Sequence, residues 1–354
     1  MNKIPKRLQN DALSTYLKKE GLTRIHQGKV RDTYSIDGDH LLVVATDRIS
    51  IFDFVLNALV PKKGEVLTAL THFWLTNLLS EFNHHLIKTK ETDLLKRSFN
   101  GAYDLKGRLP DLPIECCLVV KNLAGKLYPF EMIYRHHIGG SVFKKYQETG
   151  IAGGQNISPN LPKWSKLDKP IFTPSTKEEV GHDINVDALY YFMTMKEKGL
   201  ANEMYQMVEM LSQVYSMAYS YAEEKGILIL DTKMEVAEGL TIIDEILTPD
   251  SSRFALKSDW QQALKEGRDP KFLDKQPVRD WGDKIKTPFY EGAEQIIGIK
   301  KLDPENPEHV SFVHGLKVPS KIINDTTNRY LKLFHAITGR DLVNYQWDEM
   351  GVED

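Results

Sequence analysis

The stretch that decides the fold is residues 227–254, which read ILILDTKMEVAEGLTIIDEILTPDSSRF. It begins with four consecutive apolar β-formers, which predict a strand buried on both faces. Charged residues then occupy every second position, at Asp231, Lys233 and Glu235. Because side chains alternate across a strand, we expect these three to share one face.

A hairpin is predicted next, with residues 238–239 as a two-residue turn in which glycine supplies the unusual backbone angles. In that register Glu235 lies opposite Ile242. Lys233 then lies opposite Asp244, and opposed residues of an antiparallel pair point to the same side. The pattern therefore predicts that four charged side chains converge on one polar face of an otherwise apolar hairpin: Asp231, Lys233, Glu235 and Asp244.

Three interpretations of this polar face stand side by side. It is the solvated face of an edge hairpin, a salt-bridge lattice around Lys233, or a metal site. The apolar run before it and the turn-rich residues 248–253 after it favour the metal, because carboxylates in an apolar setting need a partner and a divalent cation is a strong one. Oxygen-only ligands favour Mg²⁺, which takes one or two carboxylates together with substrate phosphates.

Length and composition exclude several classes of protein. The 354 residues suffice for about two or three packed subdomains, and a formal net charge of −3 gives no sign of a nucleic-acid binder. No apolar run approaches ~20 residues and the N-terminus lacks a signal-peptide core, so we expect neither a membrane-spanning helix nor secretion. The adjacent Cys116 and Cys117 are expected to be reduced, buried side chains, as in a cytoplasmic protein.

Two short motifs near the N-terminus are candidate binding sites. In GKVRD at residues 28–32, Gly28 lies at a strand–strand corner where backbone N–H groups can approach phosphate oxygens, and Lys29 adds a positive charge. An ordinary turn would use the same residues. DRISIFD at residues 47–53 follows a buried strand predicted over 40–46. Its polar side chains form a candidate site for substrate, with a capped and salt-bridged turn as the alternative: Asp47, Ser50 and Asp53.

An anion site is predicted farther along the chain. Residues 131–135 form a short expected strand that leads to a Gly-Gly-Ser turn and a helix from about residue 142. Arg135, Ser141 and the free N–H groups at the start of that helix suit an anion such as a sugar phosphate.

The middle of the chain predicts a hinge, a loop and a helix. Residues 121–127 are expected to link an N-terminal β-rich lobe to the remainder. Residues 150–181, rich in Gly, Pro, Ser and Asn, predict a long irregular loop whose end carries Lys177 and, just beyond it, Asp183. The apolar stripe over 202–225 predicts the longest helix, which Gly226 ends.

Seven motifs in fixed order resemble the SAICAR synthetase family (phosphoribosylaminoimidazole-succinocarboxamide synthase). They are GKVRD at 28–32, DRISIFD at 47–53, IFTPSTKEE at 171–179, GHD at 181–183, DTKMEV at 231–236, IDEILTPDSSRF at 243–254 and DKQPVRDW at 274–281. The resemblance covers most of residues 20–285 and resumes near 319. Each motif alone is weak, but the ordered set is highly specific.

The resemblance implies an α+β fold and a ligase of de novo purine synthesis. Such an enzyme joins L-aspartate to the carboxylate of carboxyaminoimidazole ribonucleotide (CAIR), driven by ATP and Mg²⁺, through an acyl phosphate. It implies a kinase-like N-terminal β-rich lobe over residues 1–121 that binds the nucleotide. Residues 122–354 would form a C-terminal α+β lobe, related to ATP-grasp enzymes, that carries the metal and ribonucleotide site. The partners are small molecules, in a monomer or small homo-oligomer.

The resemblance also implies roles for individual residues. Gly28, Lys29 and Lys177 correspond to contacts with nucleotide phosphates, and Glu235 and Asp244 to the Mg²⁺–nucleotide carboxylates. Lys233 and Asp231 line the space between nucleotide and substrate, with Lys177 as the third catalytic candidate. The remaining expected substrate contacts are Arg135, Ser141, Arg253, Asp47, Ser50, Asp53 and Asp183.

The sequence departs from the family pattern at several places. His136-His137 stand where Gly-Tyr is more common, Val236-Ala237 replace Phe-Gly, and Ala255 replaces a common Trp. Residues 288–318 match nothing in the family. Two other functions are consistent with the charged hairpin: a small-molecule kinase such as an inositol-phosphate kinase, and a non-catalytic nucleotide-binding regulator. The DRISIFD and TPSTK motifs count against the kinase, and the retained charged residues count against the regulator.

Overall fold

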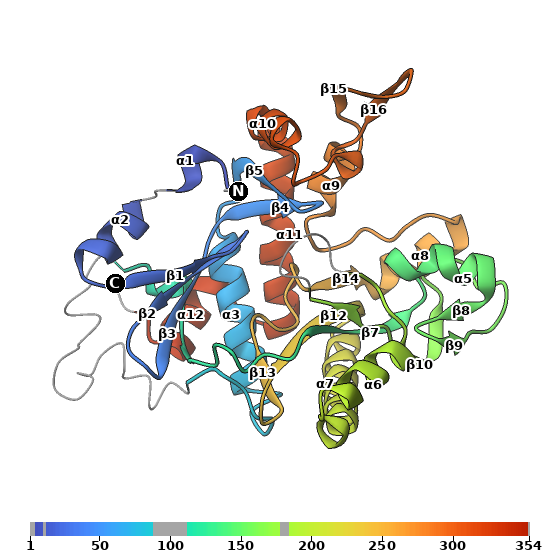
Figure 1. Cartoon of the computed structure of the whole chain (residues 1–354), viewed down its shortest axis with the longest axis horizontal. Coiled ribbons are helices and arrows are strands. Elements are labelled where there is room, and N and C mark those ends of the chain that lie inside the picture. Colours follow the sequence, from blue (N-terminus) through green and yellow to red (C-terminus); the bar gives the residue numbers. More distant parts are fainter. Residues whose placement is uncertain (1–3, 10–11, 88–111, 178–183, 353–354) are drawn as a thin grey trace.

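Strand β12 (Ile227–Ala237) runs through the middle of the larger of the two main antiparallel sheets (Figure 1). The computed structural model describes residues 4–9, 12–87, 112–177 and 184–352. The first four residues of β12 are buried, as their unbroken apolar run predicts. The described chain is a mixture of helices and antiparallel sheets, so the predicted α+β class is confirmed.

The helices and strands have the following bounds. The helices are α1 (Lys6–Gln9), α2 (Ala12–Lys19), α3 (Lys63–Thr76), α5 (Phe143–Thr149), α6 (Ala188–Glu197), α7 (Ala201–Glu224), α8 (Lys257–Glu266), α9 (Gln276–Gly282), α10 (Pro307–Gly315), α11 (Ser320–Thr338) and α12 (Leu342–Met350), with 3-10 turns at η2 (Ile114–Cys116), η3 (Gly140–Val142) and η4 (Ile299–Lys301). The strands are β1 (Thr23–Gln27), β2 (Arg31–Ser35), β3 (His40–Ala45), β4 (Arg48–Ile51), β5 (Phe54–Leu59), β6 (Cys117–Lys121), β7 (Phe130–His137), β8 (Ile151–Ala152), β9 (Gln155–Asn156), β10 (Lys166–Phe172), β11 (Ser175–Thr176), β12, β13 (Thr241–Ile243), β14 (Ser252–Leu256), β15 (Lys286–Glu291) and β16 (Glu294–Ile297).

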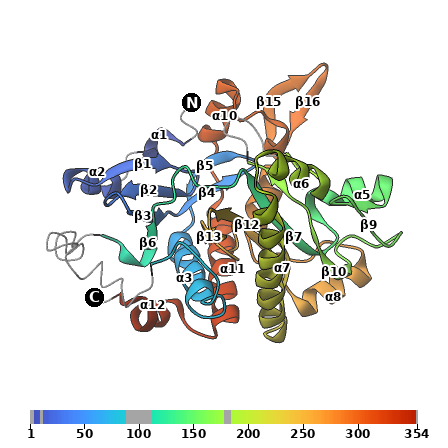
Figure 2. The same ribbon diagram turned by 60° about the horizontal axis from the view of Figure 1, so that its bottom comes forward.

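The N-terminal sheet has four antiparallel strands in the order β1-β2-β3-β6. Its inward-facing Tyr34, Leu42 and Val119 pack with Leu17 of α2 in a small core of their own. The sheet therefore stands as a separate layer beside the larger one, as Figures 1 and 2 show.

The larger sheet has the order β10-β7-β12-β13, with β11 paired to β7 and β14 paired to β12. The long helix α7 packs along β12, and the predicted helix over 202–225 is confirmed at 201–224. Gly226 follows it with a φ of 75°, a left-handed conformation that glycine adopts without strain.

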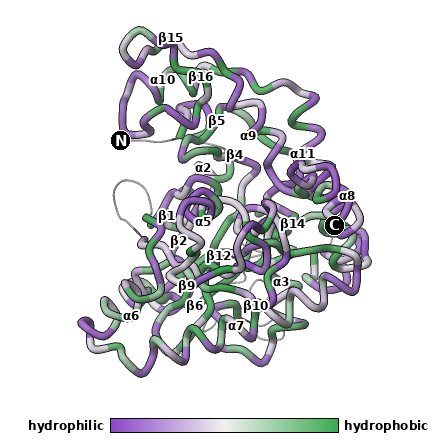
Figure 3. Tube along the Cα trace, turned by 90° about the vertical axis from the view of Figure 1, so that its right-hand side faces the viewer, coloured by the Kyte–Doolittle hydropathy of each residue, from purple (hydrophilic) through white to green (hydrophobic). Residues whose placement is uncertain are grey.

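Helix α3 joins the two layers. Its apolar residues, including the fully buried Trp74, belong to the same core as residues of α7, β12 and α11. Figure 3 shows apolar segments gathering in the interior around β12. Since α3 lies at residues 63–76, this packing crosses the lobe boundary predicted at residue 121.

The segment 288–318, in which no family motif was recognised in the sequence, has a structure of its own. It forms the hairpin β15–β16, the turn η4 and helix α10. Ile299 and Val313 pack in a third core with Ile49 and Phe54 of the β4–β5 hairpin and Val278 of α9. The segment therefore supports the DRISIFD hairpin from outside.

Two predictions about local structure are wrong. The β12–β13 turn holds three residues, 238–240, rather than two, so Glu235 pairs with Ile243 instead of Ile242. Leu240 has a left-handed φ of 54°, which the sequence does not predict. Residues 150–181 are also not one irregular loop, because β8, β9, β10 and β11 lie within them up to residue 176.

Candidate functional site

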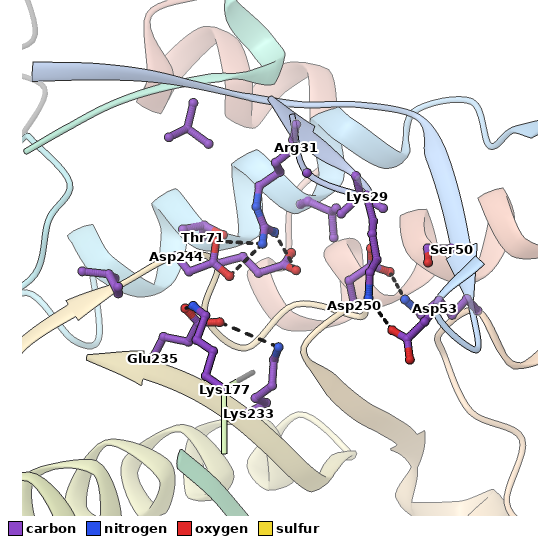
Figure 4. A pocket seen from close by; sticks show the side chains of 18 of the residues that line it. Lys29, Arg31, Ser50, Asp53, Thr71, Lys177, Lys233, Glu235, Asp244 and Asp250 are labelled. Atoms are coloured by element: carbon purple, nitrogen blue, oxygen red, sulfur yellow. Dashed lines mark hydrogen bonds and ion pairs between the residues drawn. The ribbon is translucent and has the colours of Figure 1, made fainter. Parts of the chain in front are cut away.

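A cavity of about 1330 Å³ lies between the two sheets. One end is apolar and is lined by strands of the N-terminal sheet and by α3. The other end is charged and is lined by β12, the turn after β13, and α9. Figure 4 shows the charged side chains of both lobes pointing into this space.

The glycine loop at the cavity mouth is held by Arg48. Its guanidinium donates to the backbone carbonyls of Gly28 at 3.1 Å and Lys29 at 3.2 Å, and it pairs with the buried Asp32. Gly28 itself admits no side chain, because a Cβ there would lie 2.7 Å from the carbonyl oxygen of Arg31. The GKVRD and DRISIFD motifs therefore meet in one structural unit that fixes the position of Lys29.

Lys29 points across the cavity to the β4–β5 hairpin. Its ammonium pairs with Asp53, which has a left-handed φ of 65° at the hairpin turn (Figure 4). Ser50 on β4 lines the cavity beside them. Asp47 does not: its carboxylate accepts a hydrogen bond of 2.9 Å from the backbone N–H of Gly64 in the first turn of α3. For Asp47, the alternative of a capped turn describes the observed contact.

The predicted polar face of β12 carries a network of lysines and carboxylates. Lys233 pairs with Glu131 of β7 and lies 3.8 Å from Glu235, which in turn pairs with Lys177. Glu131 is buried and accepts a hydrogen bond from Ser175 at 3.2 Å. Burial alone would lower the pKa of Lys233, but Glu131 and Glu235 outweigh it and raise that pKa above its usual range. Lys233 is therefore a fixed positive charge.

Asp244 lines the cavity, but it does not lie opposite Lys233 on the strand as the predicted register requires. It lies one residue beyond β13 and has a left-handed φ of 62°, so it leaves the strand instead of facing Lys233 across it. Arg31 of β2 pairs with Asp244 at 2.7 Å and with Glu245 at 2.6 Å. Asp244 and Glu235 nevertheless line the same cavity, and the negative charges of both help to raise the pKa of Lys233.

The carboxylate of Asp231 is shared by two arginines. Arg135 of β7 and Arg253 of β14 both pair with its carboxylate, the latter at 2.5 Å. Arg135 also donates to Ser141 at 3.3 Å and to Thr173 at 2.9 Å. Burial would raise the pKa of Asp231, but the two arginines hold it below its ordinary value.

A glycine and a tryptophan shape the wall around these arginines. A Cβ on Gly139 would lie 2.2 Å from the ring of Trp164, so only glycine fits there. The same ring lies 5.7 Å from the guanidinium of Arg253. Gly140, Ser141 and Arg253 line the cavity and together present hydroxyl and guanidinium donors suited to an anion.

The apolar end is lined mainly by aliphatic side chains. Val43, Leu118 and Val120 form one wall, and α3 and His85 form another. Burial lowers the pKa of His85 to about 4, so its ring is neutral at pH 7. Its Nε2 and the hydroxyl of Thr71 have no hydrogen-bond partner among the residues that the structure describes.

A buried charge cluster lies under the charged end. Asp250 pairs with Lys63 at 2.7 Å, accepts a hydrogen bond from Tyr330 at 2.6 Å, and has Lys275 at 3.6 Å. Burial would raise the pKa of Asp250, but the two lysines and the tyrosine lower it strongly. Lys275 lies just before α9 and Arg279 lies on α9, and both side chains line the cavity.

The structure brings most of the predicted site residues together. Ten line the cavity: Gly28, Lys29, Ser50, Asp53, Ser141, Lys177, Lys233, Glu235, Asp244 and Arg253. Arg135 and Asp231 lie behind the lining and hold it, and Asp47 lies at the start of α3. Asp183 falls outside the described residues.

Several charged residues of the site were given no role from the sequence. They include Arg31, Glu131, Asp250, Lys275 and Arg279. All but Glu131 lie inside motifs that carry the family resemblance, so their positions were marked although their roles were not. Glu131 lies four residues before Arg135 on the same strand, and a period of two would have placed both on one face.

The donor set fits a magnesium ion that is shared with a nucleotide. Within the described ranges, no group of three or more His, Cys, Asp or Glu side chains is arranged to hold a metal. Glu235 and Asp244 both line the cavity, and their described ion pairs are with Lys177, Lys233 and Arg31. Mg²⁺ commonly takes one or two carboxylates and completes its shell with phosphates and water, so two carboxylates in an open cavity suffice.

Comparison with known proteins places these observations in a family. The SAICAR synthetase family profile matches residues 24–296, so the expectation that nothing in the family matches from residue 288 onward is wrong for residues 288–296. Phosphoribosylaminoimidazole-succinocarboxamide synthase of Thermodesulfovibrio yellowstonii is 36% identical over 336 residues, which cover 94% of this chain and 100% of that protein. The enzyme of the same name from Actinobacillus succinogenes is 37% identical over 324 residues, covering 90% of this chain and 98% of that protein.

Solved structures of SAICAR synthetases match this chain as well. SAICAR synthase from Saccharomyces cerevisiae in complex with SAICAR is 30% identical and superposes with a TM-score of 0.70, over 90% of this chain and 96% of that one. A SAICAR synthetase in complex with ADP, 20% identical with a TM-score of 0.55, shares the fold. None of the helices in the described parts of the chain is both long and apolar enough to cross a bilayer.

Proposed function

The chain belongs to the SAICAR synthetase family, and we propose that its inter-sheet cavity carries the family's reaction, the ATP-dependent ligation of L-aspartate to the carboxylate of CAIR. The products are SAICAR, ADP and phosphate, and the enzyme is a carbon–nitrogen ligase of purine biosynthesis. The observation that carries the site assignment is the lysine–carboxylate network of β12, which lies between an apolar end and an arginine-rich end of one cavity.

We assign the nucleotide to the apolar end. The valines and leucines of the N-terminal sheet suit the faces of a purine base, and Thr71 and His85 offer polar atoms without another partner in the described chain. Lys29 on the glycine loop and Lys177 on the opposite wall would then reach the phosphates. This assignment gives residues 1–121 the nucleotide-binding role that the sequence predicts.

We assign the ribonucleotide to the arginine end. Arg253 and Ser141 line it, and Arg135 positions both through Asp231 and through its hydrogen bond to Ser141. Arginine presents a planar fork of N–H donors that matches the oxygens of a phosphate group. With ATP and CAIR so placed, the γ-phosphoryl group and the CAIR carboxylate both lie near Lys233.

The chemistry proceeds in two displacements. A carboxylate is a poor electrophile, so one of its oxygens first attacks the γ-phosphorus of ATP, the bond to the β,γ-bridging oxygen breaks, and ADP leaves. The amine of aspartate then attacks the carbonyl carbon of the acyl phosphate, loses a proton, and expels phosphate together with that carboxylate oxygen. Lys29, Lys177 and Lys233 neutralise charge on the transferring group, which is the main catalytic need of phosphoryl transfer.

Magnesium enters the proposal through Glu235 and Asp244, which would hold it. When bound, it neutralises charge on the nucleotide phosphates. Lys177 and Arg31 pair with these two carboxylates in the structure. The proposal also places the reaction in the cytoplasm, with small molecules as the partners.

ADP release tests the function directly. We expect release at full rate only when CAIR and aspartate are both present, with SAICAR detected by mass. ADP formed together with a phosphorylated small molecule in place of SAICAR would indicate a kinase. Nucleotide binding without turnover under any combination of substrates would indicate a regulator.

The metal assignment has its own test. Glu235→Gln removes a charged ligand with little change in shape, so Mg²⁺-dependent nucleotide affinity measured by calorimetry should fall. Glu238→Gln is the matched control, because Glu238 is exposed in the β12–β13 turn and lies outside the cavity lining. Equal Mg²⁺ dependence in the two variants would return Glu235 to the salt-bridge interpretation.

A further inference from the structure

Trp164 forms an aromatic wall of the arginine end, and its backbone is strained. Its φ of 69° is left-handed, a conformation that residues other than glycine rarely adopt. The ring fills the space that a side chain on Gly139 would need, and its centre lies 5.7 Å from the guanidinium carbon of Arg253. A strained residue keeps its conformation only when its surroundings hold it, so the contacts of Trp164 determine the position of this wall.

Two side chains hold the carbonyl oxygen of Trp164. The Nδ1 atom of His137 lies 3.1 Å from that oxygen, and the indole N–H of Trp260 donates to it at 2.8 Å. Trp164 has two further polar contacts: its backbone N–H donates to the carbonyl of Ile138 at 2.7 Å, and its indole N–H donates to Asp269 at 2.9 Å. We call the side chains of His137 and Trp260 the carbonyl clamp.

The partners of His137 fix which of its ring nitrogens carries the proton. A carbonyl oxygen only accepts hydrogen bonds, so Nδ1 must be protonated and must donate. Nε2 lies 3.1 Å from the hydroxyl of Tyr219, and burial raises the pKa of that hydroxyl, so the hydroxyl keeps its proton and donates to Nε2. Burial also lowers the pKa of His137 to about 4. His137 is therefore a neutral imidazole with a partner on each nitrogen.

The clamp acts on Arg253 through the ring of Trp164. Arg253 pairs with Asp231, but Asp231 is shared with Arg135. A single ion pair lets a guanidinium rotate about the shared contact, and a second contact restricts that rotation. The indole ring supplies the second contact, because an aromatic face attracts a cation. A change at the clamp should therefore loosen the guanidinium of Arg253 without removing its charge.

We propose that His137 and Trp260 are positioning residues for the ribonucleotide, because the clamp keeps the ring of Trp164 against Arg253. Trp164 and Arg253 line the cavity, whereas the two clamp residues do not and act only through Trp164. The inference rests on the proposed function, which assigns the ribonucleotide to the arginine end. It also gives a role to the His136-His137 pair, a departure from the family pattern that the reaction itself leaves unexplained.

Two substitutions at His137 separate the roles of its two nitrogens. The amide of asparagine places an N–H donor near the position of Nδ1, whereas the amide of glutamine reaches the position of Nε2. We therefore expect His137→Gln to raise the KM for CAIR about three- to tenfold and His137→Asn to keep it within about twofold of the wild type. The KM for ATP should stay within about twofold in both variants.

Trp260→Phe tests the other half of the clamp. It keeps an aromatic ring but loses the N–H that donates to Trp164, so it should raise the KM for CAIR as His137→Gln does. Trp260 is only partly buried on α8. If the His137 variants fail to fold, Trp260→Phe takes their place in every measurement.

His335→Gln is the matched control. The Nδ1 atom of His335 lies 3.2 Å from the carbonyl oxygen of Arg340, which is the same kind of contact. His335 is exposed near the end of α11 and lies outside the cavity lining, so its replacement should leave the KM for CAIR unchanged. A circular-dichroism melt checks the fold of each variant.

A double variant tests whether the clamp acts through Arg253. In an Arg253→Lys background, His137→Gln should raise the KM for CAIR less than about twofold, because the geometry that the clamp maintains is already lost. Fully additive effects would overturn the proposal. So would an unchanged KM for CAIR in both His137→Gln and Trp260→Phe, or a KM for ATP that rises as much as that for CAIR.

Calorimetry of CAIR binding separates this proposal from the proposed function, because it needs no turnover. A wild type that binds CAIR but forms no SAICAR would remove the ligase assignment, and the CAIR affinities of the variants would still decide the role of the clamp. A wild type that does not bind CAIR would remove both. A wild type that forms SAICAR, with a CAIR affinity insensitive to His137 and Trp260, would remove only the clamp.

Discussion

The guanidinium of Arg31 lies 2.7 Å from the carboxylate of Asp244 and 2.6 Å from that of Glu245, although Arg31 and Asp244 are 213 positions apart in the chain. This contact ties a strand of the N-terminal sheet to the end of the β12–β13 hairpin (Figure 4). Burial would lower the pKa of Arg31, but the two carboxylates outweigh it and raise that pKa, so the arginine stays charged. Arg31 thereby positions a carboxylate that we assign to the metal.

Replacing Arg31 should therefore change the metal dependence of the enzyme. In Arg31→Gln, Asp244 loses its charged partner and its fixed orientation, and we expect the Mg²⁺ concentration at half-maximal nucleotide binding to rise severalfold. The Mg²⁺ concentration at half-maximal binding for Arg31→Lys should lie between those of the wild type and Arg31→Gln. One ammonium group cannot hold both carboxylates as the forked guanidinium does. Calorimetry of nucleotide binding across a Mg²⁺ series measures the effect, and a circular-dichroism melt checks the fold. An unchanged Mg²⁺ series in Arg31→Gln would separate Asp244 from the metal.

Arg253→Lys keeps the positive charge at the arginine end but loses the two-pronged geometry. Its side chain pairs with Asp231 and lies beside the ring of Trp164, so the charge is held in one place. We expect the KM for CAIR to rise about tenfold, since one charge-assisted hydrogen bond is lost, and the KM for ATP to stay nearly constant. If steady-state kinetics instead show the ATP KM rising, Arg253 serves the nucleotide.

Arg48→Lys tests the support of the glycine loop. The lysine can still pair with Asp32, but it cannot also donate to the carbonyls of Gly28 and Lys29. The loop should loosen, and the KM for ATP should rise roughly tenfold while that for CAIR stays constant. Arg340→Lys, which alters a half-exposed arginine in ion pairs near the C-terminus, is the control. Equal ATP KM values in the two variants would show that the loop needs no such support.

Stability should fall as the pH drops from about 7 toward 4. Burial lowers the pKa of His72, His85, His136 and His137 to about 4, below the ordinary value of about 6.5. Between these values the unfolded chain binds more protons than the folded one, so His72, His85 and His137 each cost up to about 1.4 kcal/mol per pH unit, and the partly buried His136 costs less. Below the folded pKa the loss is complete. Buried Asp47 and Asp274, whose pKa values burial raises, act in the opposite direction.

Thermal unfolding measures this pH dependence. His72 is buried against Tyr345 and lies outside the cavity lining, so His72→Gln isolates one of the four groups. We expect a shallower decline of the melting temperature between pH 6.5 and 4.5 in this variant than in the wild type. A wild-type melting temperature that stays level over that range would contradict the assignment of neutral, buried histidines.

The strand β12 and its charged face follow from local sequence, but the contacts of that face do not. Period-two alternation correctly placed Lys233 and Glu235 together, because side-chain direction in a strand depends only on position. The register failed because Leu240 takes a left-handed conformation that hydrophobic residues rarely adopt, which adds one residue to the turn. Asp244 lines the same cavity as Glu235, although it enters that cavity from a turn and not from the strand.

Local sequence patterns do not predict contacts between distant segments of the chain. The pairing of Arg31 with Asp244 and of Lys63 with Asp250 joins parts of the chain that no periodicity relates. Asp47 illustrates the opposite error: its motif marks a functional region, yet its carboxylate binds the start of α3. The motif order identified the family, and the tertiary structure was needed to divide each motif into residues that line the cavity and residues that hold the lining.

The most direct test of the account follows one oxygen atom. If the CAIR carboxylate is phosphorylated by ATP, CAIR labelled with ¹⁸O in that carboxylate should transfer one labelled oxygen per turnover to the released phosphate, in step with SAICAR formation. Labelled phosphate should appear only in the complete reaction with aspartate. Unlabelled phosphate, with the labelled oxygen that the carboxylate loses recovered in water instead, would contradict the acyl phosphate, and with it the central role assigned to the lysines around Glu235.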